Sequence, residues 1–306
     1  MTNIQKGFYL VLGTALISGL ANFFNKSGMQ ALGKDAFQYT TLKNIVVALI
    51  LTLIILTPFI FKKLKALNKK DWLKLSLIGL IGGSIPFLLF FKGLSLTSPV
   101  SASFIHKTLF IWVAILALPI LKEKLSKLQF VALGVLFVGN IIFNGFSGLT
   151  FGYAEILILI ATLLWSLENV IAKIALKSID SLVLAWGRMF FGSIILILFL
   201  LFTRNTEGLL ELSFSQLAWV FLVSLLLCGY VITWYKALSR LPVTITASVL
   251  VLASPLTTFL NSAFVTHKLP QEKIWGTLII LMGAILFWKF KKRSPNKKQL
   301  YGESIS

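Results

Sequence analysis

The sequence has little charge and almost no cysteine, and both shortages narrow the class of protein. Only 13% of the 306 residues are Asp, Glu, Lys or Arg, whereas soluble domains carry about 25%. The single cysteine, Cys228, excludes an intramolecular disulfide and a Cys-x-x-Cys metal or redox site. The two histidines, His106 and His267, lie far apart and form no His-x-x-x-His zinc motif. We therefore expect no metal site.

Enzyme motifs are absent as well. The chain has no Gly-rich phosphate loop and no nucleophile elbow. An enzyme acting on lipid would need a nucleophile, metal ligands or paired acids near the membrane surface, and no such set is visible. We expect no catalytic residue and no cofactor. A purely structural role remains an alternative, but it leaves the charged residues inside the apolar runs unexplained.

Long apolar runs are what the sequence does have. Hydrophobic residues make up 57% of the chain, the mean hydropathy is +0.90, and a membrane span needs about 20 apolar residues. Candidate spans lie near 7–27, 36–60, 72–94, 98–121, 128–146, 153–176, 181–203, 215–238, 243–266 and 274–290. The sequence thus predicts an all-α integral membrane protein with ten transmembrane helices.

The positive charges are distributed unevenly among the loops. The formal net charge is +19, and about 20 of the 29 Lys and Arg residues lie in the termini and in alternate loops. About six lie in the other loops and three within spans. This bias predicts a multi-pass protein of the cell (inner) membrane with both termini cytoplasmic. Because the basic runs flank spans and form no stripe with interleaved aromatics, we expect no nucleic-acid partner.

The two halves of the chain resemble each other. Lys43 aligns with Arg188, and Asn22 aligns with Asn169. The matching segments are "FFKGLSLTSPVSAS" (90–103) with "WYKALSRLPVTITAS" (234–248), and "YTTLKNIVVALILTLIIL" (39–56) with "LAWGRMFFGSIILILFLL" (184–201). We predict a first five-helix repeat at 1–146, a second at 147–290, and a basic cytoplasmic tail at 291–306.

A repeat of five helices has a mechanical consequence. Five is odd, so the second copy enters the membrane from the opposite side. Inverted repeats are typical of secondary transporters, in which a central site at the repeat interface opens alternately to each face of the membrane. The repeat pattern therefore indicates a transporter.

The same segments carry a resemblance to a known family. Together with "LKEKLS" (121–126) and "ASPLTTFL" (253–260), they resemble the EamA-type permeases of the drug/metabolite transporter superfamily. The resemblance implies a central cavity, with the fifth and tenth helices peripheral. Two departures stand out: the position of the family's helix-4 proline falls near Ile111, and its second-half acid is replaced by His267, while Glu123 keeps the first-half acid.

Four ionisable residues lie well inside predicted spans: Lys43, Lys107, Glu168 and Arg188. Such a residue costs roughly 2.5–3.5 kcal/mol at the centre of a span, so we expect the four to face a shared cavity. Three cations and one anion leave an excess of positive charge. That excess indicates a ligand with a carboxylate or phosphate, bound by the fork of Arg188 and the point charges of the lysines.

Other residues with helical spacing extend this prediction. Trp165 and Glu168 share one face of a helix, while Tyr230 and Trp234 form an aromatic wall on another. The predicted substrate-binding residues are Asn22, Lys43, Lys107, Trp165, Asn169, Arg188, Tyr230 and Trp234, and the predicted coupling residues are Glu168 and His106.

Each of these residues also has a structural interpretation. Glu168 is either a coupling group or half of a salt bridge to Lys107 or Arg188 that holds helices in register. His106 is either a titrating group with a suitable pKa range or a hydrogen-bonded core residue. Lys173, near a helix end, is expected to extend to the membrane surface.

The function that the sequence favours is secondary transport of a small anionic or zwitterionic metabolite, such as an amino acid, by alternating access, with export as the expected direction. The alternative is proton-coupled efflux of cationic drugs, which a membrane carboxylate suits but three neighbouring cations oppose. The partners are a small-molecule substrate and the lipid bilayer, with protons as the hypothetical coupling ion. The sequence indicates no oligomeric state.

Overall fold

The computed structural model describes residues 1–97, 99–144, 152–268 and 271–289. Within these ranges the chain forms helices and turns and no strand. The predicted basic tail, 291–306, lies outside the described residues. The elements are α1 (Asn3–Leu32), α2 (Ala36–Ile55), α3 (Pro58–Lys65), α4 (Lys69–Ile78), the π-helix η1 (Gly79–Ser84), α5 (Ile85–Leu96), α6 (Pro99–Lys107), α7 (Leu109–Ile120), α8 (Lys127–Asn144), α9 (Tyr153–Ala175), α10 (Ser181–Phe202), α11 (Phe214–Leu238), α12 (Val243–Leu250), α13 (Ala253–Asn261), the π-helix η2 (Ser262–Thr266) and α14 (Gln271–Lys289).

The all-helical membrane architecture expected from the sequence is confirmed. Seven helices of the described chain are long and apolar enough to cross a membrane. Three further apolar helices, at Phe104–Ile120, Lys127–Phe143 and Lys273–Phe287, are shorter. Together these ten helices coincide with the ten apolar runs of the sequence, although only seven reach the full length of a span.

Local sequence signals fix where many helices begin. The side chains of Asp35, Asn68 and Asp180 accept backbone N–H bonds at the starts of α2, α4 and α10, which satisfies donors that the first turn leaves free. Ser213 and Gln216 form a reciprocal capping box at the start of α11. These caps fix the residues at which the helices begin, and so the position of each buried residue along its helix.

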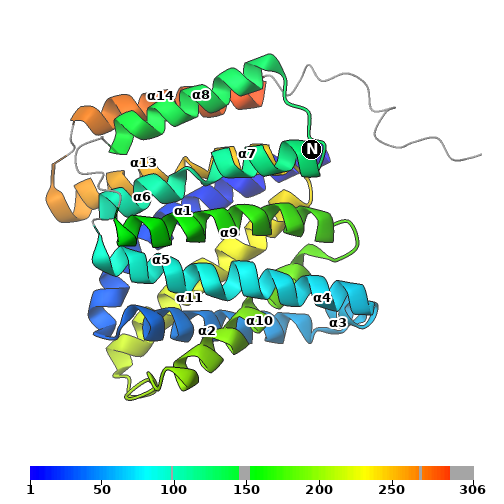
Figure 1. Cartoon of the computed structure of the whole chain (residues 1–306), viewed down its shortest axis with the longest axis vertical. Coiled ribbons are helices and arrows are strands. Elements are labelled where there is room, and N and C mark those ends of the chain that lie inside the picture. Colours follow the sequence, from blue (N-terminus) through cyan, green and yellow to red (C-terminus); the bar gives the residue numbers. More distant parts are fainter. Residues whose placement is uncertain (98, 145–151, 269–270, 290–306) are drawn as a thin grey trace, which may run out of the picture.

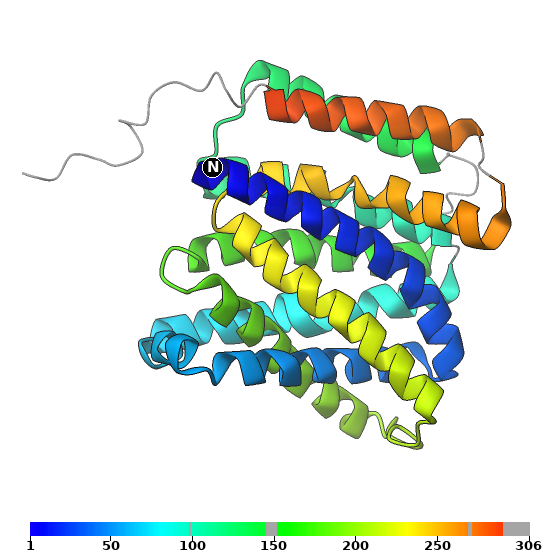
Figure 2. The same ribbon diagram turned by 180° about the vertical axis from the view of Figure 1, so that it is seen from behind.

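The long helices lie side by side, and most connections lie at their two ends (Figure 1). At one end, on the right in Figure 1, α1 begins and the segments 56–68, 121–126, 176–180 and 239–242 join helices. This end, here called the basic end, carries most of the described Lys and Arg side chains. Figure 2 shows from behind that α14 also finishes there, and that α8 and α14 form a separate layer at one side.

The helix pairs follow a two-fold pattern. The pairs of α-helices with the most extensive contacts are α8 with α14, α1 with α11, α5 with α9, α2 with α10, and α1 with α13. The first-half helices α1, α2, α5, α7 and α8 correspond, in that order, to α9, α10, α11, α13 and α14 of the second half. When each helix is replaced by its counterpart, every one of these pairs becomes a pair that is also in contact; for example, α1 with α11 becomes α9 with α5. In addition, α1 and α9 run in opposite directions (Figures 1 and 2).

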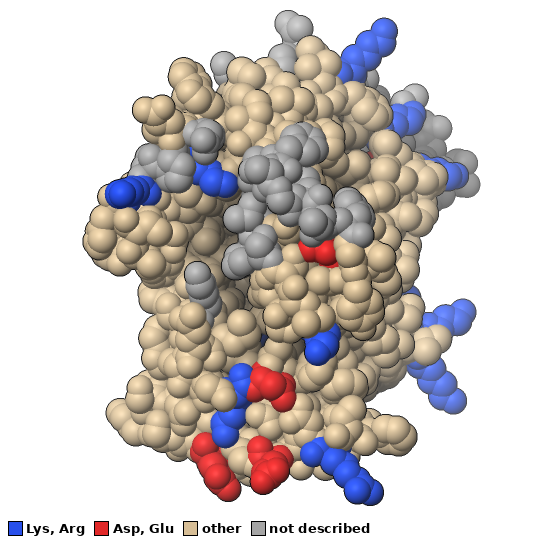
Figure 3. Space-filling model, turned by 60° about the vertical axis from the view of Figure 1, so that its left-hand side comes forward, with Lys and Arg blue, Asp and Glu red and all other residues tan. Residues whose placement is uncertain are grey.

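The outside of the helix layers is apolar. Leu53 on α2 and Phe130 on α8 expose 71% and 51% of their surface, and Met282 on α14 exposes 50%. Wide uncharged areas separate the few charged side chains in Figure 3. Burying such a surface in lipid removes the cost of exposing it to water.

Two spans are broken at equivalent positions. One helical run stops at Lys107 and resumes at Leu109, and the other stops at Leu250 and resumes at Ala253. Pro255 lies just after the second break, but the first break has no proline. There the hydroxyl of Thr108 donates to the carbonyl oxygen of Ile105 at 2.6 Å, and side-chain bonds of this kind compete with the helical ladder.

Candidate functional site

A buried ionic cluster joins three helices. Glu168 on α9 and Arg188 on α10 expose 1% and 6% of their surface, and Glu168 Oε2 lies 4.0 Å from Arg188 Nη1. From α11, the hydroxyl of Tyr235 donates to Glu168 Oε1 at 2.5 Å, and Arg188 Nη1 donates to that hydroxyl at 3.4 Å. The carboxylate thus has a cation and a hydroxyl donor, as a charge away from water requires.

The π-helix η1 supplies the fourth side of this cluster. The carbonyl oxygen of Gly82 accepts from Arg188 Nη2 at 3.1 Å and from Trp165 Nε1 at 3.0 Å. Because a π-helix breaks the regular bonding ladder, such insertions often occur at functional sites. A Cβ atom on Gly82 would lie 2.5 Å from Glu168 Cγ, so the close approach of η1 to Glu168 requires glycine here.

Lys43 on α2 occupies a different environment. Its ammonium lies over the rings of Tyr39 and Phe91, 5.0 and 4.8 Å from their centroids, and donates to Asn25 Oδ1 at 3.2 Å. Only 3% of Lys43 is exposed. Among the described residues no carboxylate lies within ion-pair distance of this ammonium. Aromatic faces and one amide oxygen therefore stabilise the charge.

His106 and Lys107 lie at the end of α6, at the break before α7. The ring of His106 packs between Phe90 and Trp165, with centroid distances of 5.1 and 5.0 Å. Lys107 exposes 7% of its surface, and no hydrogen bond or ion pair joins it to the described part of the chain. The buried Nδ1 atom of His106 also has no hydrogen-bond partner there. Both groups have unused hydrogen-bonding capacity.

The remaining predicted residues separate into two places. Asn169 Oδ1 accepts from Trp234 Nε1 at 3.0 Å, and the Trp234 ring stacks on Tyr230 at 6.0 Å, which forms the aromatic wall expected on α11. Asn22, the repeat partner of Asn169, is exposed on α1 and joins neither group. The residue of α1 that reaches Lys43 is Asn25 instead.

The structure thus brings Glu168, Arg188 and Trp165 together, and of the described cations only Arg188 pairs with Glu168. Sequence reasoning missed Tyr235 and Gly82. Tyr235 was passed over because the i, i+4 spacing selected Tyr230 and Trp234. The pair Gly82 and Gly83 inside an apolar run was the available signal, since small residues permit close helix approach.

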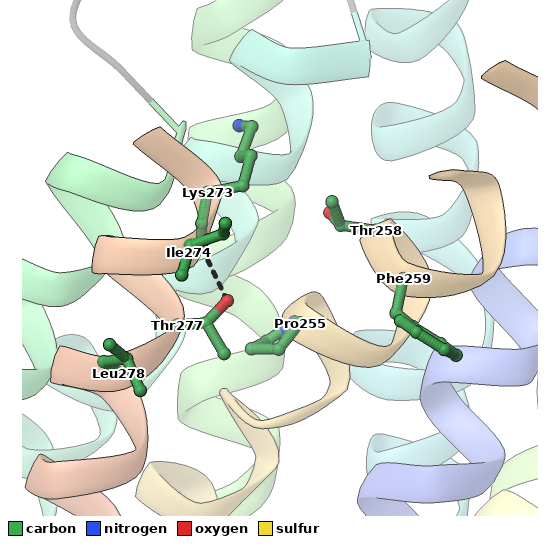
Figure 4. A pocket seen from close by; sticks show the side chains of 7 residues that line it. All are labelled: Pro255, Thr258, Phe259, Lys273, Ile274, Thr277 and Leu278. Atoms are coloured by element: carbon green, nitrogen blue, oxygen red, sulfur yellow. Dashed lines mark hydrogen bonds between the residues drawn. The ribbon is translucent and has the colours of Figure 1, made fainter. Parts of the chain in front are cut away.

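A cavity of about 160 Å³ lies between α13 and α14. Figure 4 shows Pro255 and Phe259 on one side and Ile274 and Leu278 on the other, with the Thr277 hydroxyl bonded to a backbone carbonyl. Phe259 and Leu278 expose 61% and 50% of their surface. These exposed side chains put the cavity at the apolar outer surface, and none of the predicted site residues lines it.

Comparison with family models gives two matches, to residues 5–145 and 152–289, and both are to the EamA-like transporter family. The chain belongs to the EamA-like transporter family. Its membership agrees with the drug/metabolite transporter superfamily indicated by the sequence motifs. Membership of this family indicates a membrane transporter, which implies a small-molecule substrate and a lipid bilayer, and the long apolar helices agree with a membrane location.

Curated relatives of this EamA-like chain are named as transporters. An uncharacterized transporter of Clostridium kluyveri is 25% identical over 98% of this chain and 99% of its own length. The uncharacterized transporter YyaM of Bacillus subtilis is 25% identical over 78% of this chain and 79% of its own length. Another from Methanothermobacter thermautotrophicus is 25% identical, covering 93% and 87%.

A solved crystal structure supports the fold of the EamA-like chain. It superposes with a TM-score of 0.72 at 17% identity and covers 95% of this chain and 98% of its own. At that identity the likeness concerns the arrangement of helices alone.

Proposed function

We propose that this EamA-like protein is a secondary transporter that exports a small anionic or zwitterionic metabolite by alternating access. The observation that carries the proposal is the charge of the buried groups. Lys43, Lys107 and Arg188 are each at least nine-tenths buried, and Glu168 is the one carboxylate paired with any of them in the described chain.

The partners of the three cations support different roles. Arg188 uses both terminal nitrogens on Gly82, Tyr235 and Glu168. Among the described residues the Lys107 ammonium has no bonding partner, and the sole hydrogen-bond partner of the Lys43 ammonium is an amide oxygen. A substrate carboxylate or phosphate would satisfy the two lysines at the lowest electrostatic cost. We assign first contact with the anion to Lys107 and Lys43, with Arg188 completing the site.

The aromatic residues next to these cations suit the uncharged part of a substrate. His106 directly precedes Lys107 and packs against Trp165, and Phe87 and Phe91 adjoin the Lys43 ammonium. Pockets for small molecules are typically apolar with a few polar groups that fix orientation. Tyr230, Trp234, Asn169 and Asn22 are further proposed contacts in other conformations, and Glu168 with His106 is the proposed proton-coupling pair.

The two-fold packing pattern supports alternating access. Helices of residues 1–146 pair with helices of 147–290, and the breaks at Thr108 and Val251–Leu252 lie in corresponding spans. Inverted repeats of five helices each, ten spans in all, provide two equivalent ways to open the same site. The basic end is the cytoplasmic one in this proposal.

Thermal stability in detergent across a library of carboxylates, phosphates, amino acids and lipophilic cations tests the substrate class. A ligand at 100 times its dissociation constant adds about 2.7 kcal/mol of stability. We expect stabilisation by anionic or zwitterionic compounds, followed by flux of the labelled compound in proteoliposomes. Stabilisation by lipophilic cations alone would support the drug-efflux alternative instead.

A further inference from the structure

The loop between α11 and α12, at the basic end, is held by two ionic side chains. Lys173 on α9 donates to the carbonyl oxygen of Leu238, the last residue of α11, at 2.6 Å and to that of Leu241 in the following loop at 2.7 Å. Lys173 was predicted to extend to the membrane surface; its ammonium reaches a connecting loop at the end of the helices and lies at the C-terminus of α11, where a cation is favoured.

Glu123 holds the other side of the same loop. Its Oε1 accepts from the N–H of Val243 at 2.7 Å, and its Oε2 accepts from the N–H and the hydroxyl of Thr244 at 3.2 and 2.7 Å. Val243 and Thr244 begin α12 and are fully buried. A carboxylate in this position accepts hydrogen bonds from the free N–H groups of the first turn, and the positive end of the helix dipole stabilises its charge.

The Glu123 contact crosses between the two family-matched units. Glu123 follows α7 within 5–145, whereas α12 lies within 152–289. A movement of the two units against each other at the basic end would separate the segment after α7 from the start of α12. All three hydrogen bonds of this carboxylate would break in that movement.

At the end of the helices opposite the basic end, the two units are joined by different contacts. The repeat offset is 144 positions, as between Lys92 and Lys236. The same offset makes His267 the repeat counterpart of Glu123. His267 is exposed, follows the π-helix η2 and has a positive φ of 53°. At this end the loop before α6 is joined through the hydroxyl of Thr97, which donates to Glu155.

We propose that Glu123 is a latch that holds the basic end closed, and that the missing carboxylate at position 267 makes the two ends unequal. Breaking the latch shifts the protein towards the conformation open at the basic end. This inference rests on the proposed alternating access, because a latch regulates transport only if the two units move against each other.

Distances between spin labels test the latch without a substrate. One pair replaces the exposed residues Lys124 and Ser239 at the basic end, and the other replaces their repeat counterparts Lys268 and Ser95. Both pairs are built with Cys228→Ser and measured in proteoliposomes. The variants are Glu123→Ala, Glu123→Gln and Thr244→Val, and the control is Glu207→Ala, which removes an exposed carboxylate elsewhere.

We expect Glu123→Ala to lengthen the Lys124–Ser239 distance and shorten the Ser95–Lys268 distance. The ratio of the two populations should move roughly tenfold or more, as expected for losing bonds to a charged acceptor. Glu123→Gln and Thr244→Val remove fewer bonds and should shift the ratio less, which keeps the test open if Glu123→Ala misfolds. Unchanged distances, or a change at the basic end alone, would overturn the latch.

The outcome is separable from the fate of the proposed function. If the distances change as expected but no solute is transported, the latch stands and the substrate proposal fails. If anions are transported and the distances do not respond to Glu123, the reverse holds.

Discussion

Trp165 and Arg188, on neighbouring helices, donate to one and the same acceptor, the carbonyl oxygen of Gly82. The shared carbonyl ties α9 and α10 to the π-helix η1 and fixes the guanidinium beside Glu168. Two directional bonds to one oxygen leave little freedom for any of the three elements. The ion pair therefore depends on backbone geometry as much as on the two charges.

Removing Arg188 should destabilise the protein. Arg188→Ala leaves the Glu168 carboxylate buried without its cation, which typically costs about 3–5 kcal/mol. Arg188→Lys keeps the charge but cannot reach Gly82, Tyr235 and Glu168 together, so a smaller loss is expected. Thermal unfolding in detergent measures both. The double variant Arg188→Met with Glu168→Gln should recover much of the stability, and a wild-type midpoint for Arg188→Ala would contradict the structural part of its role.

Removing the Lys107 ammonium should weaken ligand binding without lowering stability. Because this group has no described partner, Lys107→Met is expected to leave stability unchanged or raised. Affinity for an anionic ligand should fall by about 1.5–3 kcal/mol, the value of a hydrogen bond to a charged group. Titration of the ligand found in the library screen checks this. The exposed residue Lys92 gives the matched control Lys92→Met, and equal affinities in the two variants would remove Lys107 from the site.

Glu168→Gln tests proton coupling. If Glu168 carries the coupled proton, the variant should lose uphill transport driven by a pH gradient and keep downhill exchange of substrate. Both rates are measured in the same proteoliposomes, with Glu207→Gln as the control carboxylate. Loss of both activities together with loss of folded protein would show that Glu168 is structural.

Gly83 should not tolerate a methyl group. A Cβ atom there would lie 2.2 Å from the carbonyl oxygen of Arg188, so α10 and η1 must move apart. We expect Gly83→Ala to lower the unfolding midpoint markedly. Gly13 on α1 has no neighbour within 4 Å of its virtual Cβ, so Gly13→Ala should be neutral or slightly stabilising. Equal midpoints would show that the close contact relaxes without cost.

The proposed orientation places the basic end in the cytoplasm. A reporter that is active only in the cytoplasm should be active when fused after Ser306 and inactive when inserted at Glu207, in the loop between α10 and α11 at the opposite end. The Lys and Arg bias of the loops is the physical reason. The reverse pattern of activity would invert the proposed direction of every step.

Much of this fold was predictable because the bilayer imposes simple length and polarity rules. The helical runs and the burial of Lys43, Glu168 and Arg188 followed from apolar stretches interrupted by charge. Which charge meets which was harder. Glu168 selects Arg188 and not Lys107, because η1 and Tyr235 orient the guanidinium. A π-helix depends on local backbone packing that composition does not encode.

Asn22 shows a second limit of sequence reasoning. Its alignment with Asn169 suggested equivalent roles, yet Asn169 is buried against Trp234 and Asn22 is exposed. Similar repeat residues need not have similar surroundings, because the partner half also differs. Asn25, on the same helix as Asn22, contacts Lys43 and Tyr39, and no repeat signal pointed to it.

The layer formed by α8 and α14 has a consequence for how the chain is assembled. Each helix comes last in its matched unit, and they meet so closely that a Cβ on Gly276 would lie 2.5 Å from the backbone of Phe143. Each of the five α-helix pairs with the most extensive contacts likewise joins one unit to the other. The peptide connection between the units is therefore not what holds them together. Two separate polypeptides, divided between 145 and 152, would keep these helix contacts of the described chain, and we expect them to associate in the membrane as subunits of a dimer do.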